Sequence, residues 1–275
     1  MASSKDFREL LDVEVVVDLE RLRDLSNGGI PDDFRGIVWS YLLGVRRPDK
    51  SSVTKLISGD NLVKEDVRMV KLVKRDIQRL LEFQSDRYFE LSEYRIRTSV
   101  TTMLSTYYGE NASSVSNKIG YISIALPFAL LYESSEEGYL CFASFMEKMQ
   151  DFLSTSSVVQ FIMLFRSVLP ELVSYFEDEE VQIQEWAVDW YQFMLATVLD
   201  RRTLLPLWDM YATLPDGMEL HPYVCVAILG TCEEELMSFD KEEIQYFLTN
   251  LPALSVPQLV AQALNFREEA LDWDV

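Results

Sequence analysis

One histidine and three cysteines are the residues of this chain best suited to metal binding or nucleophilic catalysis. His221 precedes Cys225 by four residues, a spacing that would place both side chains on one face of a helix. A structural zinc site needs four ligands, and a Ser-His-Asp triad would need this same histidine beside a serine in a sharp turn. Because the cysteines are odd in number and form no Cys-x-x-Cys pair, we interpret Cys141, Cys225 and Cys232 as buried free thiols in a reducing compartment. We expect no metal and no cofactor.

Nucleotide chemistry carried out by the chain alone is also disfavoured. The chain has no glycine-rich loop of the kind that cradles phosphates, and the serine-rich run at 113–116 lacks a Gly-x-Ser-x-Gly pattern. The chain therefore lacks the residues that most hydrolase and kinase mechanisms require.

The charge distribution excludes further classes of partner. The net charge is −20, and residues 1–100 hold 18 acidic and 18 basic side chains, whereas residues 101–275 hold 27 and 7. Nucleic-acid binding needs a basic face, so we expect no nucleic-acid partner. We interpret the acidic side chains of residues 101–275 as solvated helix faces. The alternative is that they repel the wrong partner proteins and accept a basic partner.

Composition and hydropathy indicate a globular protein rather than a membrane protein. Apolar residues make up 48% of the chain and charged residues 25%. The charge-free stretch 244–266 contains Pro252 and Pro257, so it is not a plausible membrane-spanning helix, and the charged N-terminus lacks the apolar core of a signal peptide. We expect a cytoplasmic protein without direct membrane insertion, which reaches the cytosolic face of endomembranes through partners.

Apolar residues recur at three- and four-residue steps nearly throughout, and no alternating strand pattern is present. We therefore predict an all-α fold, as a single domain with an N-terminal lobe of about residues 1–155 and a C-terminal lobe of about 156–275. The predicted helices cover residues 7–25, 32–43, 62–82, 90–107, 118–132, 137–154, 157–176, 182–199, 201–212, 219–237, 241–249 and 256–270.

Four short segments on these helices carry more specific information. The first runs from Gly29 to Gly44 and places Arg35 four residues before Trp39, a spacing that allows a cation–π contact. The second is Val73-Lys74-Arg75-Asp76-Ile77-Gln78-Arg79. The third and fourth are Trp186-Ala187-Val188-Asp189-Trp190-Tyr191 and Leu207-Trp208-Asp209-Met210.

In this order and together, the four segments resemble the TBC domain, the all-helical module of Rab GTPase-activating proteins. The resemblance implies an all-α fold of two helical lobes and a GTP-bound Rab-type small GTPase as partner, with a role in vesicle trafficking. It implies that Arg79 is the arginine finger, which the protein inserts into the GTPase, with Asp76 as a supporting residue. Arg35, Trp39 and Tyr121 are further supporting positions. We also expect Trp39 and Trp208 to be largely buried, because their motifs resemble framework segments of the family.

One family motif is degenerate. The family has Tyr-x-Gln followed by Gly-Met-Asn, and the corresponding stretch here is Gly120-Tyr121-Ile122-Ser123-Ile124. Ser123 takes the position of the glutamine finger, but it lacks the longer stem and the amide that would orient the attacking water. We interpret it as a small residue in a buried helix, with its hydroxyl bonded back to a carbonyl oxygen one turn earlier.

Two functions remain open at this point. In the first, the protein is a GTPase activator, rather than an enzyme in its own right, that stimulates hydrolysis with Arg79 while the GTPase positions the water. In the second, it is a catalytically inactive TBC module that binds a GTPase or serves as a scaffold or subunit of a larger complex. An unrelated helical adaptor is a third, weaker reading. A solvent-facing Arg79 within reach of Ser123 across one groove would favour the first, and an Arg79 held in an internal salt bridge would favour the second.

Overall fold

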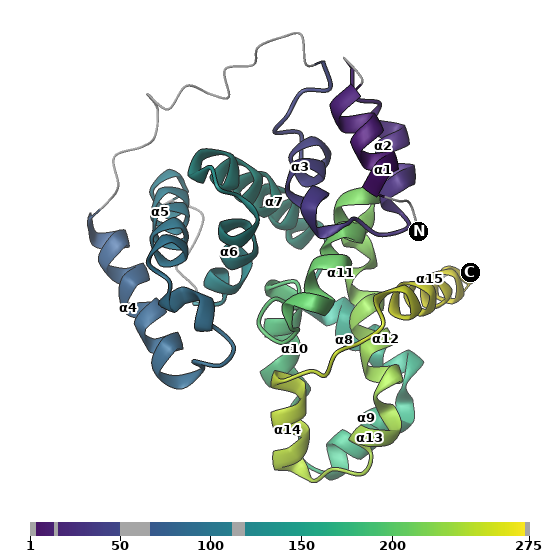
Figure 1. Cartoon of the computed structure of the whole chain (residues 1–275). Coiled ribbons are helices and arrows are strands. Elements are labelled where there is room, and N and C mark those ends of the chain that lie inside the picture. Colours follow the sequence, from purple (N-terminus) through teal and green to yellow (C-terminus); the bar gives the residue numbers. More distant parts are fainter. Residues whose placement is uncertain (1–3, 14–15, 50–66, 112–118, 273–275) are drawn as a thin grey trace. The chain divides into compact units, whose positions relative to one another are not determined.

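The computed structural model describes residues 4–13, 16–49, 67–111 and 119–272 (Figure 1). Across these residues the secondary structure is helical, and the only β pairing is an isolated antiparallel bridge between Val16 and Asp49. The predicted all-α fold class is confirmed.

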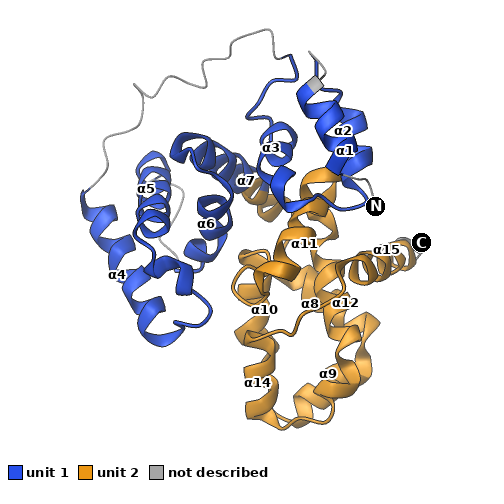
Figure 2. Ribbon diagram, in the orientation of Figure 1, with its two compact units in different colours: residues 1–148 blue, residues 149–275 orange. Residues whose placement is uncertain are grey.

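The chain divides into two compact units, residues 1–148 and residues 149–275 (Figure 2). The boundary lies within α7 (Ser135–Thr155), which is a continuous helix. The two-lobed single domain with a boundary near residue 155 stays a prediction.

In unit 1, three helices pack side by side in chain order (Figure 1). They are α4 (Val67–Phe83), α5 (Tyr94–Glu110) and α6 (Gly120–Leu131). A 3-10 helix, η3 (Phe89–Ser92), connects α4 to α5 and packs against both. Helix α6 is apolar on all sides and buried nearly throughout, so it forms the centre of this unit, with α3 (Asp32–Leu42) packed against it.

The N-terminal segment corrects the prediction of one continuous helix over residues 7–25. The structure has α1 (Ser4–Arg8), a π-helical turn (Glu9–Val13) and α2 (Leu19–Ser26). β-branched side chains lose χ1 freedom in a helix, and the intervening sequence is rich in valine; Val16 pairs with Asp49 instead. The side chain of Asp18 then accepts backbone N–H bonds from Glu20 and Arg21 and begins α2 as its N-cap.

In unit 2 a buried helix, α12 (His221–Thr231), packs against helices on several sides. Its neighbours are α8 (Val158–Val168), α10 (Ile183–Gln192) and α15 (Val256–Asp272). Residues from Val224 to Leu229 are fully buried, which explains why α12 is apolar on every face. The remaining helices of the unit are α9 (Pro170–Asp178), α11 (Arg201–Thr213), η4 (Gly217–Leu220), α13 (Glu233–Leu236) and α14 (Lys241–Thr249).

Three predicted helices of this unit are interrupted in the structure. The helix expected over 157–176 breaks between α8 and α9 because Pro170 has no N–H to donate and disfavours helical geometry at Leu169. The helix expected over 182–199 ends at Gln192, and Met194 and Leu195 take positive φ angles of 49° and 63°. The segment 219–237 divides into η4, α12 and α13.

Glycine is required at one of the predicted loops. A Cβ built on Gly217 would lie 2.4 Å from the carbonyl oxygen of Tyr211, closer than a side chain can approach a backbone atom. The Pro215-Asp216-Gly217 turn can therefore close onto the end of α11 only without a side chain at 217.

No single helix in the described ranges has the length and apolarity to cross a bilayer. The helices α8 and α9 meet the length and composition criteria when taken as a pair, but they are bent by 104° at the break between them.

Candidate functional site

Helix α4 presents Arg79 to solvent beside a buried carboxylate. Val73, Ile77 and Leu80 are buried on one face and anchor the helix. Arg79 lies on the outer face with its side chain 57% exposed, whereas the side chain of Asp76 is only 6% exposed. An oxygen of Asp76 lies 3.7 Å from Arg79 Nη1 and 3.4 Å from Arg75 Nε. The carboxylate therefore draws two neighbouring guanidinium groups toward one point without burying Arg79.

The exposed part of α4 is mainly basic, with Glu82 as an exposed acidic residue near its C-terminal end. Besides Arg79, four exposed basic side chains follow one another along the helix: Arg68, Lys71, Lys74 and Arg75. Unit 2, by contrast, has exposed acidic side chains on α9, α13 and α14, among them Glu177, Asp178, Glu234, Glu235, Glu242 and Glu243. The α4 face is thus the place where an anionic group of a partner would be attracted.

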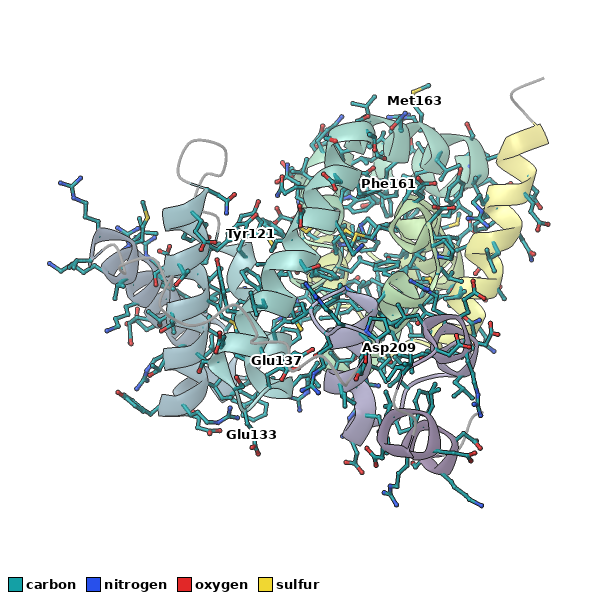
Figure 3. The ribbon with its side chains drawn as sticks, turned by 90° about the horizontal axis from the view of Figure 1, so that it is seen from above. Tyr121, Glu133, Glu137, Phe161, Met163 and Asp209 are labelled. Atoms are coloured by element: carbon teal, nitrogen blue, oxygen red, sulfur yellow. The ribbon has the colours of Figure 1, made fainter. Side chains whose placement is uncertain are left out.

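Ser123 lies inside the helix packing of unit 1. It is 4% exposed, and its hydroxyl oxygen lies 2.7 Å from the hydroxyl of the buried Tyr88. Tyr121, on the same helix α6, is also 4% exposed and its ring lies 6.3 Å from that of Tyr108 (Figure 3). The expectation that residue 123 is a small residue in a buried helix is confirmed, but its hydroxyl pairs with Tyr88 rather than with a carbonyl oxygen one turn earlier in the helix. Its partner Tyr88 could not be identified from the sequence, because 35 residues separate the two.

The first motif is structural. Arg35 is 4% exposed; its Nη1 binds the carboxylate of Asp32 and its Nη2 donates to the carbonyl oxygen of Ile30 at 2.9 Å. These bonds connect the first turn of α3 to Ile30, which precedes the helix. Trp39 is 1% exposed and its ring lies 5.5 Å from that of Phe128, so its predicted burial is confirmed. The cation–π contact between Arg35 and Trp39 stays a prediction.

A partly buried ionic cluster joins Ser40 of α3 and the following Arg46 to α7, and sequence reasoning missed it. Glu137 accepts two hydrogen bonds from Arg46, at 2.6 and 2.9 Å, and its carboxylate lies 2.8 Å from the hydroxyl of Ser40 (Figure 3). Burial alone would raise the pKa of Glu137, but these bonds outweigh it and lower the pKa below its usual value. The cluster fixes α7 against the motif that begins at Gly29.

The two tryptophan-containing motifs form the core of unit 2. Trp190 and Trp208 are fully buried, and their indole N–H groups donate to the carbonyl oxygens of Leu248 and Met194 at 2.9 and 3.1 Å. Trp186 lies 4.9 Å from Trp190 in a nearly perpendicular arrangement. The predicted burial of Trp208 is therefore confirmed, and these motifs position helices rather than perform chemistry.

His221 and Cys225 lie side by side, with the Cys225 Sγ 3.7 Å from Nε2 of His221. Both are fully buried, and burial raises the pKa of the Cys225 thiol, so the pair is not suited to nucleophilic chemistry. His221 is fully buried, with Nδ1 2.8 Å from the hydroxyl of Tyr211 and Nε2 3.1 Å from the carbonyl oxygen of Trp190. The carbonyl can only accept, so Nε2 carries the proton and Nδ1 accepts from the tyrosine. The described residues contain no cluster of three or more metal-ligating side chains, and all three cysteines are buried free thiols, as predicted.

The buried histidine makes stability depend on pH. Burial lowers the pKa of His221 to about 4, although hydrogen bonds to the backbone of Trp190 and Tyr191 raise it. The unfolded chain binds the proton near pH 6.5 and the folded chain only near pH 4, so this contribution to stability is complete above 6.5 and is lost as the pH falls toward 4. We expect a loss of at most about 1.4 kcal/mol per pH unit.

Denaturant titrations of the wild type and of His221→Gln at pH 7.5, 6 and 5 would measure this loss. The variant cannot titrate in this range, so its unfolding free energy should decline less steeply. Parallel pH profiles for the two proteins would show that the histidine is not the responsible group.

Comparison with known proteins assigns this arrangement to a family. The family model for the Rab-GTPase-TBC domain matches residues 32–237, which is most of the chain. The chain is 25% identical over 261 residues to the human (Homo sapiens) Ecotropic viral integration site 5 protein homolog, covering 89% of this chain and 30% of that protein. It is 22% identical over 303 residues to the GTPase-activating protein gyp1 of Schizosaccharomyces pombe, covering 90% of this chain and 56% of that protein. The chain therefore spans less than two thirds of the length of either relative.

Solved structures show the same fold. The Ypt/Rab-GAP domain of Gyp1p superposes with a TM-score of 0.73 and 16% identity, over 97% of this chain and 98% of that chain. The Chlamydomonas flagellar RabGAP TBC domain superposes with a TM-score of 0.68 and 20% identity, over 94% and 89% respectively. From the matched family model and the shared helical fold, we conclude that this chain belongs to the Rab-GTPase-TBC domain family.

Proposed function

We propose that this protein binds a GTP-bound Rab-type small GTPase and stimulates its GTP hydrolysis by inserting Arg79 into the nucleotide site. The observation that carries the proposal is the side chain of Arg79, 57% exposed on a basic helix face and placed beside the carboxylate of Asp76. Negative charge builds on the transferring phosphoryl group, and a cation supplied in trans can accelerate its transfer by roughly three to five orders of magnitude.

Asp76 supports this role as a positioning residue. Its side chain is nearly buried and lies one helical turn before Arg79, so it can orient the guanidinium group while leaving the outer nitrogen atoms exposed. The 3.7 Å separation exceeds hydrogen-bond distance. An arginine in this arrangement can extend toward a partner without first breaking a short internal hydrogen bond to Asp76.

The water must then be positioned by the GTPase. Ser123 is 4% exposed and bonded to Tyr88, so position 123 presents no group to a partner's nucleotide. In a small GTPase the carboxamide that orients the attacking water can come from the GTPase itself. We therefore propose an activator that depends on Arg79 alone.

The burial of Ser123 also favours a second candidate function, a TBC module that binds a GTPase or serves as a subunit of a larger complex without accelerating hydrolysis. Single-turnover GTP hydrolysis, measured with this protein against a panel of Rab-type GTPases, separates the two. Acceleration of any panel member supports the activator. Complex formation without acceleration across the panel supports the inactive module, and absence of both would contradict the two functions together.

Replacing Ser123 by glutamine should not increase hydrolysis. The new side chain would point into the space between α6 and Tyr88, where overpacking costs about 1–3 kcal/mol, and the amide would remain inside the protein. We expect an unchanged rate of stimulated hydrolysis and a lower melting temperature. Ser123→Ala is the matched control, because it removes the hydroxyl without adding volume. A large gain in rate for Ser123→Gln alone would show that position 123 does reach the nucleotide.

A further inference from the structure

Three exposed aromatic side chains occupy the corner of unit 1 that follows Arg79 in the chain. Phe83 ends α4 and is 83% exposed, Phe89 in η3 is 61% exposed, and Tyr94 begins α5 and is 75% exposed. The η3 helix connects α4 to α5 and packs against both, so the three residues lie on segments that pack together. We call Phe83, Phe89 and Tyr94 the aromatic corner.

Such exposure is unusual for these side chains. A phenylalanine or tyrosine can bury about 150–250 Å², and contiguous apolar patches of a few hundred Å² on a protein surface mark interaction sites. Aromatic residues and arginine are also the types that most often contribute the largest share of binding energy at interfaces. The corner has the composition of a docking surface.

The position of Phe83 connects this corner to Arg79. Phe83 follows Arg79 by four residues on α4, which places their Cβ atoms about 5–6 Å apart on one face. A specific interface covers about 800 Å² on each partner. Any protein that receives Arg79 in its nucleotide site must therefore also cover Phe83.

Further positive charges of α4 lie on the same exposed face as Arg79 and Phe83. Arg68, Lys71, Arg75 and Arg79 follow at steps of three or four residues, so they share one exposed face that leads to Phe83. Glu82, which is also exposed, adds one negative charge next to Phe83, so the face has an excess of positive charge. A partner that is complementary to this face and to the aromatic corner carries negative charge beside an apolar pocket. A GTPase whose bound nucleotide phosphates lie next to apolar side chains has both features.

We propose that the aromatic corner is the apolar anchor that holds the GTP-bound GTPase while Arg79 reaches the nucleotide. This rests on the function proposed above and adds to it the residues that determine affinity. Arg79 acts in the transition state, whereas the aromatic corner acts in complex formation. The two kinds of residue should therefore differ in which kinetic constant they change.

Phe83→Ala, in the full chain, is the variant that tests the anchor. We expect it to weaken binding to a GTPase loaded with a non-hydrolysable GTP analogue by about tenfold or more, and to raise KM for the GTPase with little change in kcat. Because Phe83 is 83% exposed, the Phe83→Ala variant should have the same melting temperature as the wild type. Tyr246→Ala is the matched control, since Tyr246 is an aromatic residue that is 71% exposed on α14 in unit 2, and it should bind like the wild type.

The outcomes separate the anchor from the proposed activity. If the wild type accelerates hydrolysis and Phe83→Ala has the same KM, the anchor is wrong and the activity stands. If the wild type binds without accelerating and Phe83→Ala loses binding, the anchor stands and the activity is wrong. Absence of binding to every GTPase of the panel overturns both. The last measurement is binding to vesicles that contain phosphatidylserine. If the wild type binds these vesicles, and Phe83→Ala abolishes vesicle binding but leaves GTPase binding unchanged, the aromatic corner binds a lipid surface and the proposal is overturned.

Discussion

Arg79→Ala is expected to reduce stimulated GTP hydrolysis by at least about two orders of magnitude while leaving complex formation with the GTPase largely intact. The guanidinium meets a full negative charge only when the phosphoryl group is being transferred, so its loss lowers kcat far more than it raises KM. The side chain is 57% exposed and lies 3.7 Å from Asp76, so the fold should tolerate its removal. Single-turnover hydrolysis and a binding assay with the same GTPase measure the two effects separately.

Arg75→Ala is the control for this experiment. Arg75 has a side chain exposed to 58%, contacts the same carboxylate at 3.4 Å and lies on the same helix, but the family resemblance does not give it the finger role. We expect its removal to slow association at low salt only, because exposed charges are screened within roughly 8–10 Å at ordinary ionic strength. Strong stimulation by the wild type that survives Arg79→Ala would contradict the proposed mechanism.

Trp208→Ala is expected to lower the free energy of unfolding by about 3–5 kcal/mol. Trp208 is fully buried in unit 2, and its indole N–H donates to the carbonyl oxygen of Met194 at 3.1 Å. Met194 and Leu195 have positive φ angles, a conformation that is strained for residues other than glycine and persists only when its surroundings hold it. The truncation would therefore leave a cavity and also release this turn.

Thermal and denaturant unfolding of Trp208→Ala and Trp208→Phe test this prediction. The phenylalanine variant keeps most of the apolar contacts and loses the hydrogen bond, so it should be less destabilised than the alanine variant. Trp39→Ala removes a side chain that is 1% exposed in unit 1, and it should lower the free energy of unfolding by an amount in the same range as Trp208→Ala. A melting temperature within a degree or two of the wild type for either alanine variant would show that the packing role is wrong.

Properties that depend on neighbours in the chain could be predicted from the sequence. The stripe of Val67, Val70, Val73, Ile77 and Leu80 predicts α4, since residues three and four apart share one side of a helix. Val73, Ile77 and Leu80 are buried as the pattern predicts, whereas Val67 at the start of the helix is 65% exposed. The same spacing places Arg79 and Asp76 together. Trp39 and Trp208 were expected to be buried because of their motifs, and both are. The helical class follows from such local patterns. The motifs that carry the resemblance to the family are also local, and the resemblance in turn implies the candidate finger.

Two breaks in helices show where this local information ends. Pro170 signals an interruption by its missing N–H, although the apolar pattern continues across it. At Met194 and Leu195 the sequence contains no such signal, because both are ordinary helix formers whose left-handed backbone is held by the bond from Trp208. Tertiary contacts override a helix propensity that differs between residues by only about 0.7 kcal/mol.

The tertiary structure alone decided which distant side chains meet and which apolar ones remain exposed. Ser123 bonds to Tyr88 across 35 residues, and Glu137 bonds to Arg46 across 91. Phe83 has the residue type of a core position, yet it is 83% exposed because α4 ends there and no described helix covers it. Helix periodicity is set by backbone geometry within one or two turns, whereas these contacts depend on how separate helices pack, which a local pattern does not encode.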